Sequence, residues 1–193
     1  MYLVLDVETN GLVVCKEFNK YYDYKELKYY KNSRIVSIAW QLMQNNKTII
    51  TTNYFIIKPN NFTIDEKSKS FEINKISKMM VKNGRNLDIV LNNFLEDLNK
   101  CEIIIAHNLN FDKNILLAEA YRLKKNILID KLLKKKSYCT MEQGKNITKI
   151  ENAYGYKYPK LTELYNHFFK KSFKAHNALN DVKATCKCFF KMK

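Results

Sequence analysis

Three acidic motifs follow one another along the chain and together carry four carboxylates and one histidine. The first motif supplies Asp6 and Glu8, the second supplies Asp112, and the third supplies His176 and Asp181. Hard divalent cations such as Mg²⁺ and Mn²⁺ prefer carboxylate oxygens as ligands. Two such cations about 3.5–4 Å apart assist phosphodiester hydrolysis, because one activates water and the other stabilises the leaving oxygen. The five side chains are therefore candidates for a two-metal hydrolytic site.

The first two motifs each follow an apolar run that is typical of a buried strand. Asp6 and Glu8 stand at the end of the strand predicted over Tyr2–Val7, and residues two apart share one face of a strand. Asp112 follows a second predicted strand, Cys101–Ala106, and lies where a helical pattern begins. A junction from strand to helix can bring Asp112 beside the first pair.

The third motif lies early in another helical stretch. The core face of this helix is predicted to contain Ala178, Val182, Cys186 and Phe189. His176 precedes Asp181 by five residues, so the two side chains would be poorly aligned on one helix. We therefore expect His176 in the loop before the helix, where its imidazole is free to reach a water.

Each motif also has a structural interpretation when it is taken alone. Asp6 and Glu8 could form a polar strand end, and His107 and Asn108 could satisfy backbone groups where the second strand ends. We favour that structural role for His107. The three motifs together favour a functional site, because four converging acids without cations would repel one another and lose hydration.

These motifs resemble those of the DEDDh exonucleases, and the similarity spans nearly the whole chain. The matching segments are residues 6–12, 34–40, 106–112, 139–141, 159–164 and 176–181. The resemblance implies a metal-dependent 3′-to-5′ exonuclease of the α/β class. It also implies the ribonuclease-H-like fold, a mixed five-stranded sheet flanked by helices.

The resemblance assigns roles to the five candidates. It implies that Asp6, Glu8, Asp112 and Asp181 bind two Mg²⁺ or Mn²⁺ ions, with Asp6 bridging both. It implies that His176 is the general base, a role that suits the one side chain with an ordinary pKa near neutral. The implied reaction is stepwise hydrolysis from the 3′ end, which releases nucleoside 5′-monophosphates.

The resemblance also marks candidate substrate contacts. Backbone groups around Thr9 would hold the 3′ end, and Leu12 would pack against the last base. Asn108 and Phe111 are further candidates, although core packing explains Phe111 equally well. One departure from the family is Asn74, which stands where many relatives have a histidine, so no substrate contact is implied at that position.

Apolar patterning predicts the remaining elements. Residues 35–42 and 48–57 are expected to form a hairpin, and residues 87–98 repeat apolar side chains at helical spacing. Two segments are candidates for the fifth strand, Leu128–Leu132 and Ser137–Met141.

Composition predicts one domain over residues 1–193. With 46% hydrophobic residues the chain can bury an adequate core. No secretory signal or membrane-spanning run is recognisable, and five cysteines without a Cys-x-x-Cys pair favour reduced thiols. We therefore expect an intracellular protein in a reducing, cytoplasmic or nuclear-like compartment, without a membrane partner.

The formal net charge of +15 suggests a nucleic-acid partner but is weak evidence alone. Only three of the 34 Lys and Arg residues are arginine, a bias expected of an AT-rich genome. Residues 16–34 form a polar insertion in which five tyrosines lie among lysines. This insertion could stack bases beside the site, or it could be a flexible loop.

Three functions agree with these observations. We favour a 3′-to-5′ exonuclease acting on single-stranded or frayed DNA, because the segments at 139–141 and 159–164 resemble the polymerase-associated branch of the family. An exoribonuclease uses the same acids, and a non-catalytic nucleic-acid-binding module would be expected to have lost an acid or the histidine. A polymerase partner would be a separate protein, and the sequence leaves the oligomeric state open.

Overall fold

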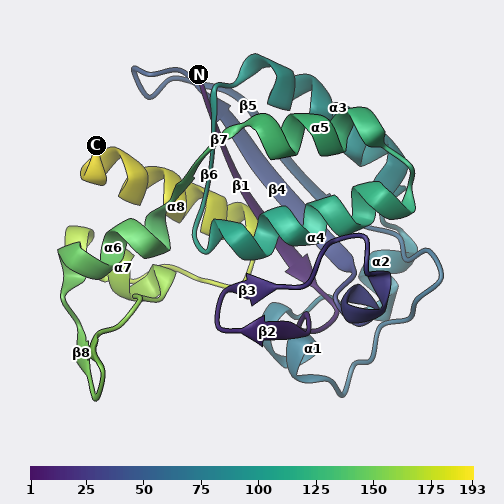
Figure 1. Ribbon diagram of the computed structural model, residues 1–193, viewed down its shortest axis with the longest axis horizontal. Helices are drawn as coiled ribbons and strands as arrows, with labels where there is room; N and C mark the ends of the chain where they lie inside the picture. The colour runs from purple at the N-terminus through teal and green to yellow at the C-terminus, as the bar shows by residue number, and fades with distance from the viewer.

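The computed structural model describes residues 1–193, and its centre is a mixed five-stranded sheet. The strand order is β5-β4-β1-β6-β7, with β6 and β7 parallel to β1 and its neighbour β4 antiparallel (Figure 1). The strands are β1 (Tyr2–Thr9), β4 (Ile35–Met43), β5 (Ile49–Ile56), β6 (Ile103–Ala106) and β7 (Lys136–Cys139). The predicted ribonuclease-H-like sheet is confirmed.

Eight helices surround this sheet. They are α1 (Lys69–Asn74), α2 (Lys78–Lys82), α3 (Leu87–Lys100), α4 (Leu109–Arg122), α5 (Asn126–Lys134), α6 (Thr140–Thr148), α7 (Leu161–Phe169) and α8 (Ala178–Met192). The predicted hairpin of β4 and β5 and the helix over residues 87–98 are confirmed. Of the two candidates for the fifth strand, the one near Ser137 is confirmed as β7, while Leu128–Leu132 lies in α5.

The apolar run Leu128–Leu132 is helical because its buried side chains recur at helical spacing. Leu128, Ile129 and Leu132 join the main core cluster, which lies between the sheet and α3, α4 and α5. No helix combines the length and apolarity needed to cross a bilayer. All five cysteines are free thiols, of which Cys15 is exposed.

The two faces of β1 pack against different helices. Leu3, Leu5 and Val7 enter the main core cluster. Tyr2 and Val4 pack on the other face, in a cluster that also contains four residues of α8. Since side chains alternate along a strand, Asp6 and Glu8 continue the face that carries Tyr2 and Val4 and that α8 covers.

The tyrosine-rich insertion is ordered, so its interpretation as a flexible loop is wrong. It contains a small hairpin, β2 (Cys15–Glu17) and β3 (Lys20–Tyr21), and the 3₁₀ helix η1 (Leu27–Tyr30). Tyr30 is fully buried in the core, and its hydroxyl donates a hydrogen bond to the Tyr22 carbonyl at 2.6 Å. The rings of Tyr22 and Tyr29 stack with centroids 3.5 Å apart. These tyrosines hold the insertion in place.

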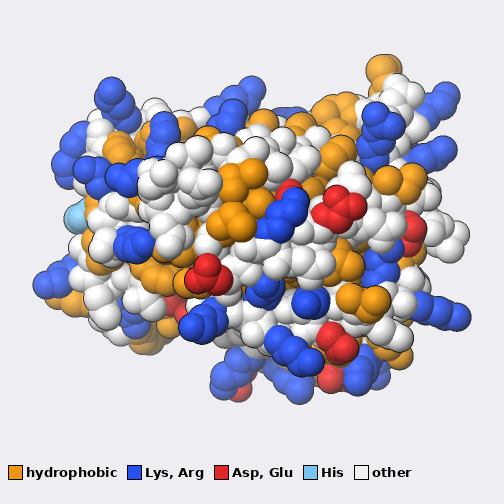
Figure 2. All heavy atoms as spheres, turned by 90° about the horizontal axis from the view of Figure 1, so that it is seen from above, with side chains coloured by type: hydrophobic (Ala, Val, Ile, Leu, Met, Phe, Trp, Pro, Cys, Tyr) orange, Lys and Arg blue, Asp and Glu red, His pale blue; other side chains and the backbone are white.

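Positive side chains are spread widely over the surface. Figure 2 shows Lys and Arg over much of one face and around its margins, rather than in a single patch. The net charge of the chain therefore does not locate a nucleic-acid surface by itself.

A buried ionic group fixes the segment before β4 to α4. The Arg34 Nε lies 2.6 Å from a carboxylate oxygen of Glu119, and Arg122 Nη1 lies 3.3 Å from the same oxygen. Arg122 also donates to the Tyr30 carbonyl, which ties η1 to the same group. The Glu119 side chain is 1% exposed, so water cannot replace it as the partner of the two guanidinium groups.

Substituting Glu119→Gln should therefore destabilise the protein strongly. Loss of the charge leaves two buried guanidinium groups without a counterion, and breaking such a pair costs about 3–5 kcal/mol. The control is Glu17→Gln, which removes an exposed ion pair with Lys20 and should cost less than about 1 kcal/mol. Urea unfolding measures both, and equal small changes would show that Glu119 is dispensable.

Candidate active site

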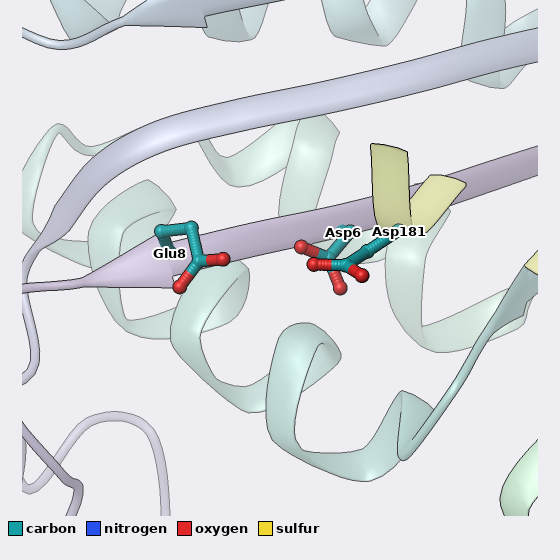
Figure 3. A group of neighbouring side chains, drawn as sticks. All are labelled: Asp6, Glu8 and Asp181. Carbon is teal, nitrogen blue, oxygen red and sulfur yellow. The ribbon is translucent and has the colours of Figure 1, made fainter. Parts of the chain in front are cut away.

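Three of the predicted carboxylates lie together at the end of β1. Asp6 and Glu8 project from the same face of the strand, and Asp181 comes from the first turn of α8 beside Asp6 (Figure 3). One oxygen from each of the three side chains can be chosen so that all lie within 4.8 Å of one another. They line a cavity of about 530 Å³ together with Asp112 and His176. The structure thus brings together all five side chains that the sequence identified.

Asp112 reaches the cavity because the parallel pairing of β1 with β6 stops short. The paired residues end at Val4 and Ile105, after which the chain turns into α4. The backbone N–H of Val7 then donates to Asp112 Oδ1 at 3.0 Å. One carboxylate oxygen of Asp112 thus continues the hydrogen bonding that β6 no longer provides, and Asp112 lies outside the most compact group of three acids.

The loop before α8 orients Asp181 and His176. Asn177 caps the N-terminus of α8, and its side chain accepts a hydrogen bond from the Asn180 N–H. The Asn177 N–H donates to Asp181 Oδ2 at 3.2 Å. His176 has a φ of 64°, in the left-handed region, and its side chain lines the cavity. The prediction that His176 lies in the loop, outside the helix, is confirmed.

Burial raises the pKa of all four carboxyl groups, and repulsion by neighbouring carboxylates adds to the rise for Asp6, Glu8 and Asp112. For Asp6, burial is the largest cause, followed by the charges of Asp112, Asp181 and Glu8, and its pKa lies well above the usual range. Burial likewise raises the pKa of Asp112, that of Glu8 to about 7 and that of Asp181 to about 6. The nearby charge of His176 acts in the opposite direction on Asp181.

The donor set fits divalent cations. None of the four carboxylates forms an ion pair with a Lys, Arg or His side chain within the chain. The ligand atoms are all carboxylate oxygens, which suit hard cations such as Mg²⁺ and Mn²⁺. A bound cation would relieve the repulsion that raises these pKa values.

A second cavity, of about 510 Å³, adjoins the first. The two share Val7, Glu8, Ile73, Phe111 and His176 as lining residues. Thr9 and Leu12 also line the second cavity. Leu12 is 84% exposed, which leaves its side chain free for a ligand, while Phe111 packs partly against the core.

The loop after β1 is held close to neighbouring backbone. A Cβ added to Gly11 would lie 2.4 Å from the Asn32 carbonyl oxygen, so only glycine fits there. Asn74, the residue that replaces the family histidine, donates from its amide to the Thr9 carbonyl at 3.2 Å and accepts from the Ile76 N–H. Asn74 thus braces the loop that carries Leu12.

His107 and Asn108, at the end of β6, differ in whether their side-chain polar atoms have hydrogen-bond partners. His107 Nδ1 lies 3.0 Å from Thr140 Oγ1, and Nε2 lies 3.0 Å from the Pro159 carbonyl. Burial lowers the pKa of His107 to about 4, so the ring is neutral near pH 7, which agrees with the structural role we favoured. Asn108 lines the acidic cavity, and its buried Oδ1 has no hydrogen-bond partner within the chain.

Lys160 lines the acidic cavity and was not among the predicted site residues. It immediately precedes α7, and its N–H donates to Glu163 in the first turn of that helix. The resemblance of the Pro-Lys-Leu segment to the family was the only feature that could have drawn attention to Lys160. Its distance from the acids along the sequence does not indicate that it lines the same cavity.

The fold and the acidic cavity define a ribonuclease-H-like protein with the four acids and the histidine of the DEDDh group. The model of the family described as Exonuclease matches residues 3–189. The chain belongs to this exonuclease family.

Individual relatives agree with this assignment. The protein named DNA polymerase III PolC-type of Caldanaerobacter subterraneus subsp. tengcongensis is 27% identical over 194 residues, which cover 99% of this chain and 11% of that protein. Exonuclease I of E. coli, solved with a 5cy-dT13 oligonucleotide, superposes with a TM-score of 0.70 at 16% identity and covers 97% of this chain. A 3′-exonuclease described as recognising the histone mRNA stem-loop has a TM-score of 0.64 at 13% identity over 99% of this chain.

The chain spans only part of two of these relatives. It covers 39% of the Exonuclease I chain, compared with 80% of the histone mRNA exonuclease chain. At these identities, the structural similarity establishes the fold.

The raised carboxyl pKa values predict how stability depends on pH in EDTA. Because these pKa values are raised on folding, the folded protein binds more protons than the unfolded chain between about pH 4 and 7. The free energy of unfolding should therefore be highest at the low end of this range and should fall as pH rises. Asp6→Asn removes one charge from the cluster. Its melting temperature should exceed that of the wild type by several degrees at pH 8 and by less at pH 5.

The matched control is Asp130→Asn, which removes an exposed carboxylate from α5. Its melting temperature should follow the wild type at both pH values. Excess Mn²⁺ should raise the wild-type melting temperature more at pH 8 than at pH 5, because cations compete with protons for the cluster. If the Asp6→Asn variant were less stable than the wild type at pH 8 in EDTA, repulsion among the carboxylates of the cluster would not be destabilising the protein.

Proposed function

We propose that this chain is a metal-dependent 3′-to-5′ exonuclease that acts on single-stranded or frayed DNA and releases nucleoside 5′-monophosphates. The observation that supports the proposal most is the meeting of four carboxylates, two of them buried and two half-buried, with His176 in one cavity of an exonuclease-family chain. Residues 1–193 act as one exonuclease domain in this proposal.

Asp6, Glu8, Asp112 and Asp181 would hold two Mg²⁺ or Mn²⁺ ions in this mechanism. Asp112 would offer the oxygen that does not accept from the Val7 N–H. The ions, when bound, supply positive charge to the scissile phosphate and favour deprotonation of the attacking water. The protein itself supplies the positions of the ligands, which β1, α4 and α8 fix independently of substrate.

His176 is the general base in the proposed reaction. Its imidazole takes the proton from the attacking water at one ring nitrogen, and its loop position leaves the ring facing the cavity. The adjacent carboxylate of Asp181 stabilises the imidazolium that results. His107 does not compete for this role, because both of its ring nitrogens already have partners.

The second cavity receives the 3′-terminal nucleotide. Thr9 contributes backbone groups, Leu12 packs against the last base, and Phe111 forms the wall shared with the acidic cavity. Asn108 lines the acidic cavity and is a further candidate for a substrate contact. The Thr9 carbonyl accepts one hydrogen bond from Asn74, which holds this part of the loop in place and leaves its second lone pair for the substrate.

Relatives favour DNA over RNA as substrate. The PolC-type relative is named a DNA polymerase, and Exonuclease I was solved with DNA oligonucleotides. The histone mRNA exonuclease supports RNA as the alternative. A non-catalytic binding module is disfavoured, because all four acids and the histidine are present. The PolC-type relative also supports a polymerase as a partner of this domain.

Matched 5′-labelled single-stranded DNA and RNA should distinguish the substrates. With Mg²⁺ or Mn²⁺, the proposal expects a ladder that shortens from the 3′ end of DNA, and no cleavage in EDTA. A faster ladder on RNA would select the exoribonuclease. Intact strands under every condition would overturn the proposed activity.

Substitutions of a carboxylate and of the proposed base should have different effects on cleavage. Asp6→Ala should abolish cleavage while leaving the fold intact, because it removes a proposed metal ligand and relieves local repulsion. His176→Asn should slow single-turnover cleavage by roughly 10²–10⁴-fold with metal binding preserved. Asparagine is chosen because it tolerates the left-handed backbone of His176. Wild-type rates in either variant would remove that residue from the mechanism.

A further inference from the structure

Phe18 and Tyr158 form an exposed pair of stacked rings that core packing does not explain. Phe18 lies in the turn between β2 and β3 and is 70% exposed, and Tyr158 is 39% exposed. Their ring centroids are 5.7 Å apart with an interplanar angle of 22°. The pair joins the insertion to the segment between β9 (Gly155–Tyr156) and α7. Large aromatic surfaces exposed in this way are typical of binding sites.

Both rings are positioned by polar contacts around them. On the Phe18 side, the neighbouring Asn19 accepts from the Asn110 amide through its carbonyl, and its own amide donates to Glu142 at 3.2 Å. On the Tyr158 side, Lys145 Nζ lies 5.1 Å from the ring centroid. These contacts order the pair before any ligand arrives, which lowers the entropy cost of binding.

The pair lies beside the acidic cavity. Asn110, which holds the Phe18 turn, precedes the cavity residue Phe111 in the first turn of α4. The Phe111 ring lies 6.4 Å from that of Tyr21 in β3. Tyr158 precedes the cavity residue Lys160 by two positions. In Figure 1 the β2–β3 hairpin lies below the start of α4.

The local charges suit a polyanionic strand. Lys145 forms no ion pair, so its charge remains available above Tyr158. Of the nearby carboxylates, Glu17 is paired with Lys20, while Glu142 accepts a hydrogen bond from the neutral Asn19 amide and keeps its charge. Aromatic faces bind nucleobases by stacking, and cations beside them bind the phosphates.

We propose that the Phe18–Tyr158 pair is a stacking site for a base upstream of the scissile phosphate, with Lys145 contacting the backbone. This inference rests on the proposed function, since it places the 3′ end in the acidic cavity. The site holds longer strands and does not take part in the chemical step. The sequence indicates that the tyrosines of the insertion could stack bases. In this proposal the insertion does stack a base, but the residue that does so is Phe18.

A second interface pair provides a matched control. Tyr24 of the insertion meets Tyr121 of α4 with centroids 6.0 Å apart, and Tyr121 is 40% exposed. This pair also joins the insertion to another element, and the exposure of Tyr121 equals that of Tyr158 within one percentage point. It lies at the far end of α4 from Asp112, so a strand bound at the cavity should not require it.

Binding should be measured in EDTA by the anisotropy of labelled dT12, so that cleavage is not needed. Phe18→Ala and Tyr158→Ala should each weaken binding about tenfold, as loss of one stacked base does. Phe18→Tyr should restore binding, Phe18→Leu should not, and Tyr121→Ala should match the wild type. Replacing the upstream bases of the oligonucleotide by abasic sites should remove the difference between wild type and Phe18→Ala.

Cleavage of dT2 in Mn²⁺ supplies the second measurement. Both variants should cleave this dinucleotide at the wild-type rate, because it is too short to use the pair. Unchanged dT12 binding, or equal losses on dT2 and dT12, would overturn the stacking site. If wild-type protein binds dT12 but cleaves nothing, the proposed activity fails while the binding comparison still tests the pair.

Discussion

Strand β1 is hydrogen-bonded on both sides, antiparallel to β4 over its length and parallel to β6 over its first half. This double pairing fixes the direction of every side chain on it. Alternate residues are buried against the two helical layers, so neither face can rotate away without exposing apolar surface. Asp6 and Glu8 are therefore held on the α8 face by the burial of Tyr2 and Val4 earlier in the strand. The apolar packing of the sheet positions the acids.

The same packing creates an electrostatic cost. Four carboxyl groups share one cavity and form no ion pair within the chain, and burial raises their pKa values. Such a cluster destabilises the free protein, and a bound cation would relieve that cost. The buried core on both faces of the sheet and the Glu119 ion pairs offset that cost elsewhere in the fold.

Local patterns in the sequence predicted much of this arrangement. The shared face of Asp6 and Glu8 follows from strand alternation, and the core face of α8 follows from helical spacing. The contact of Asp112 with the Val7 N–H was not predictable, because it depends on where the pairing of β6 stops. Burial of Tyr30 was also missed, since a tyrosine among lysines has the same local pattern whether it is packed or exposed.

Contacts between distant segments account for the rest of what the sequence did not predict. Phe18 and Tyr158 are far apart along the chain, and no periodicity relates them. The fifth strand was ambiguous because β7 is short and mostly polar, while the more apolar Leu128–Leu132 is helical. Tertiary packing alone brings Phe18 to Tyr158, whereas the helix over Leu128–Leu132 follows from the helical spacing of its buried side chains.

The hydrogen bond between Val7 and Asp112 makes the two oxygens of this carboxylate unequal. Oδ1 accepts from the backbone N–H, so the other oxygen of Asp112 is the one with both lone pairs available to a cation. An asparagine at this position would keep its carbonyl on the Val7 N–H and turn its NH₂ group toward the cavity. Aspartate and asparagine at position 112 thus differ in hydrogen-bond polarity as well as in charge. The Val7 N–H of β1 holds one oxygen of either side chain, so the atom that faces the other acids is an oxygen in aspartate and an NH₂ group in asparagine.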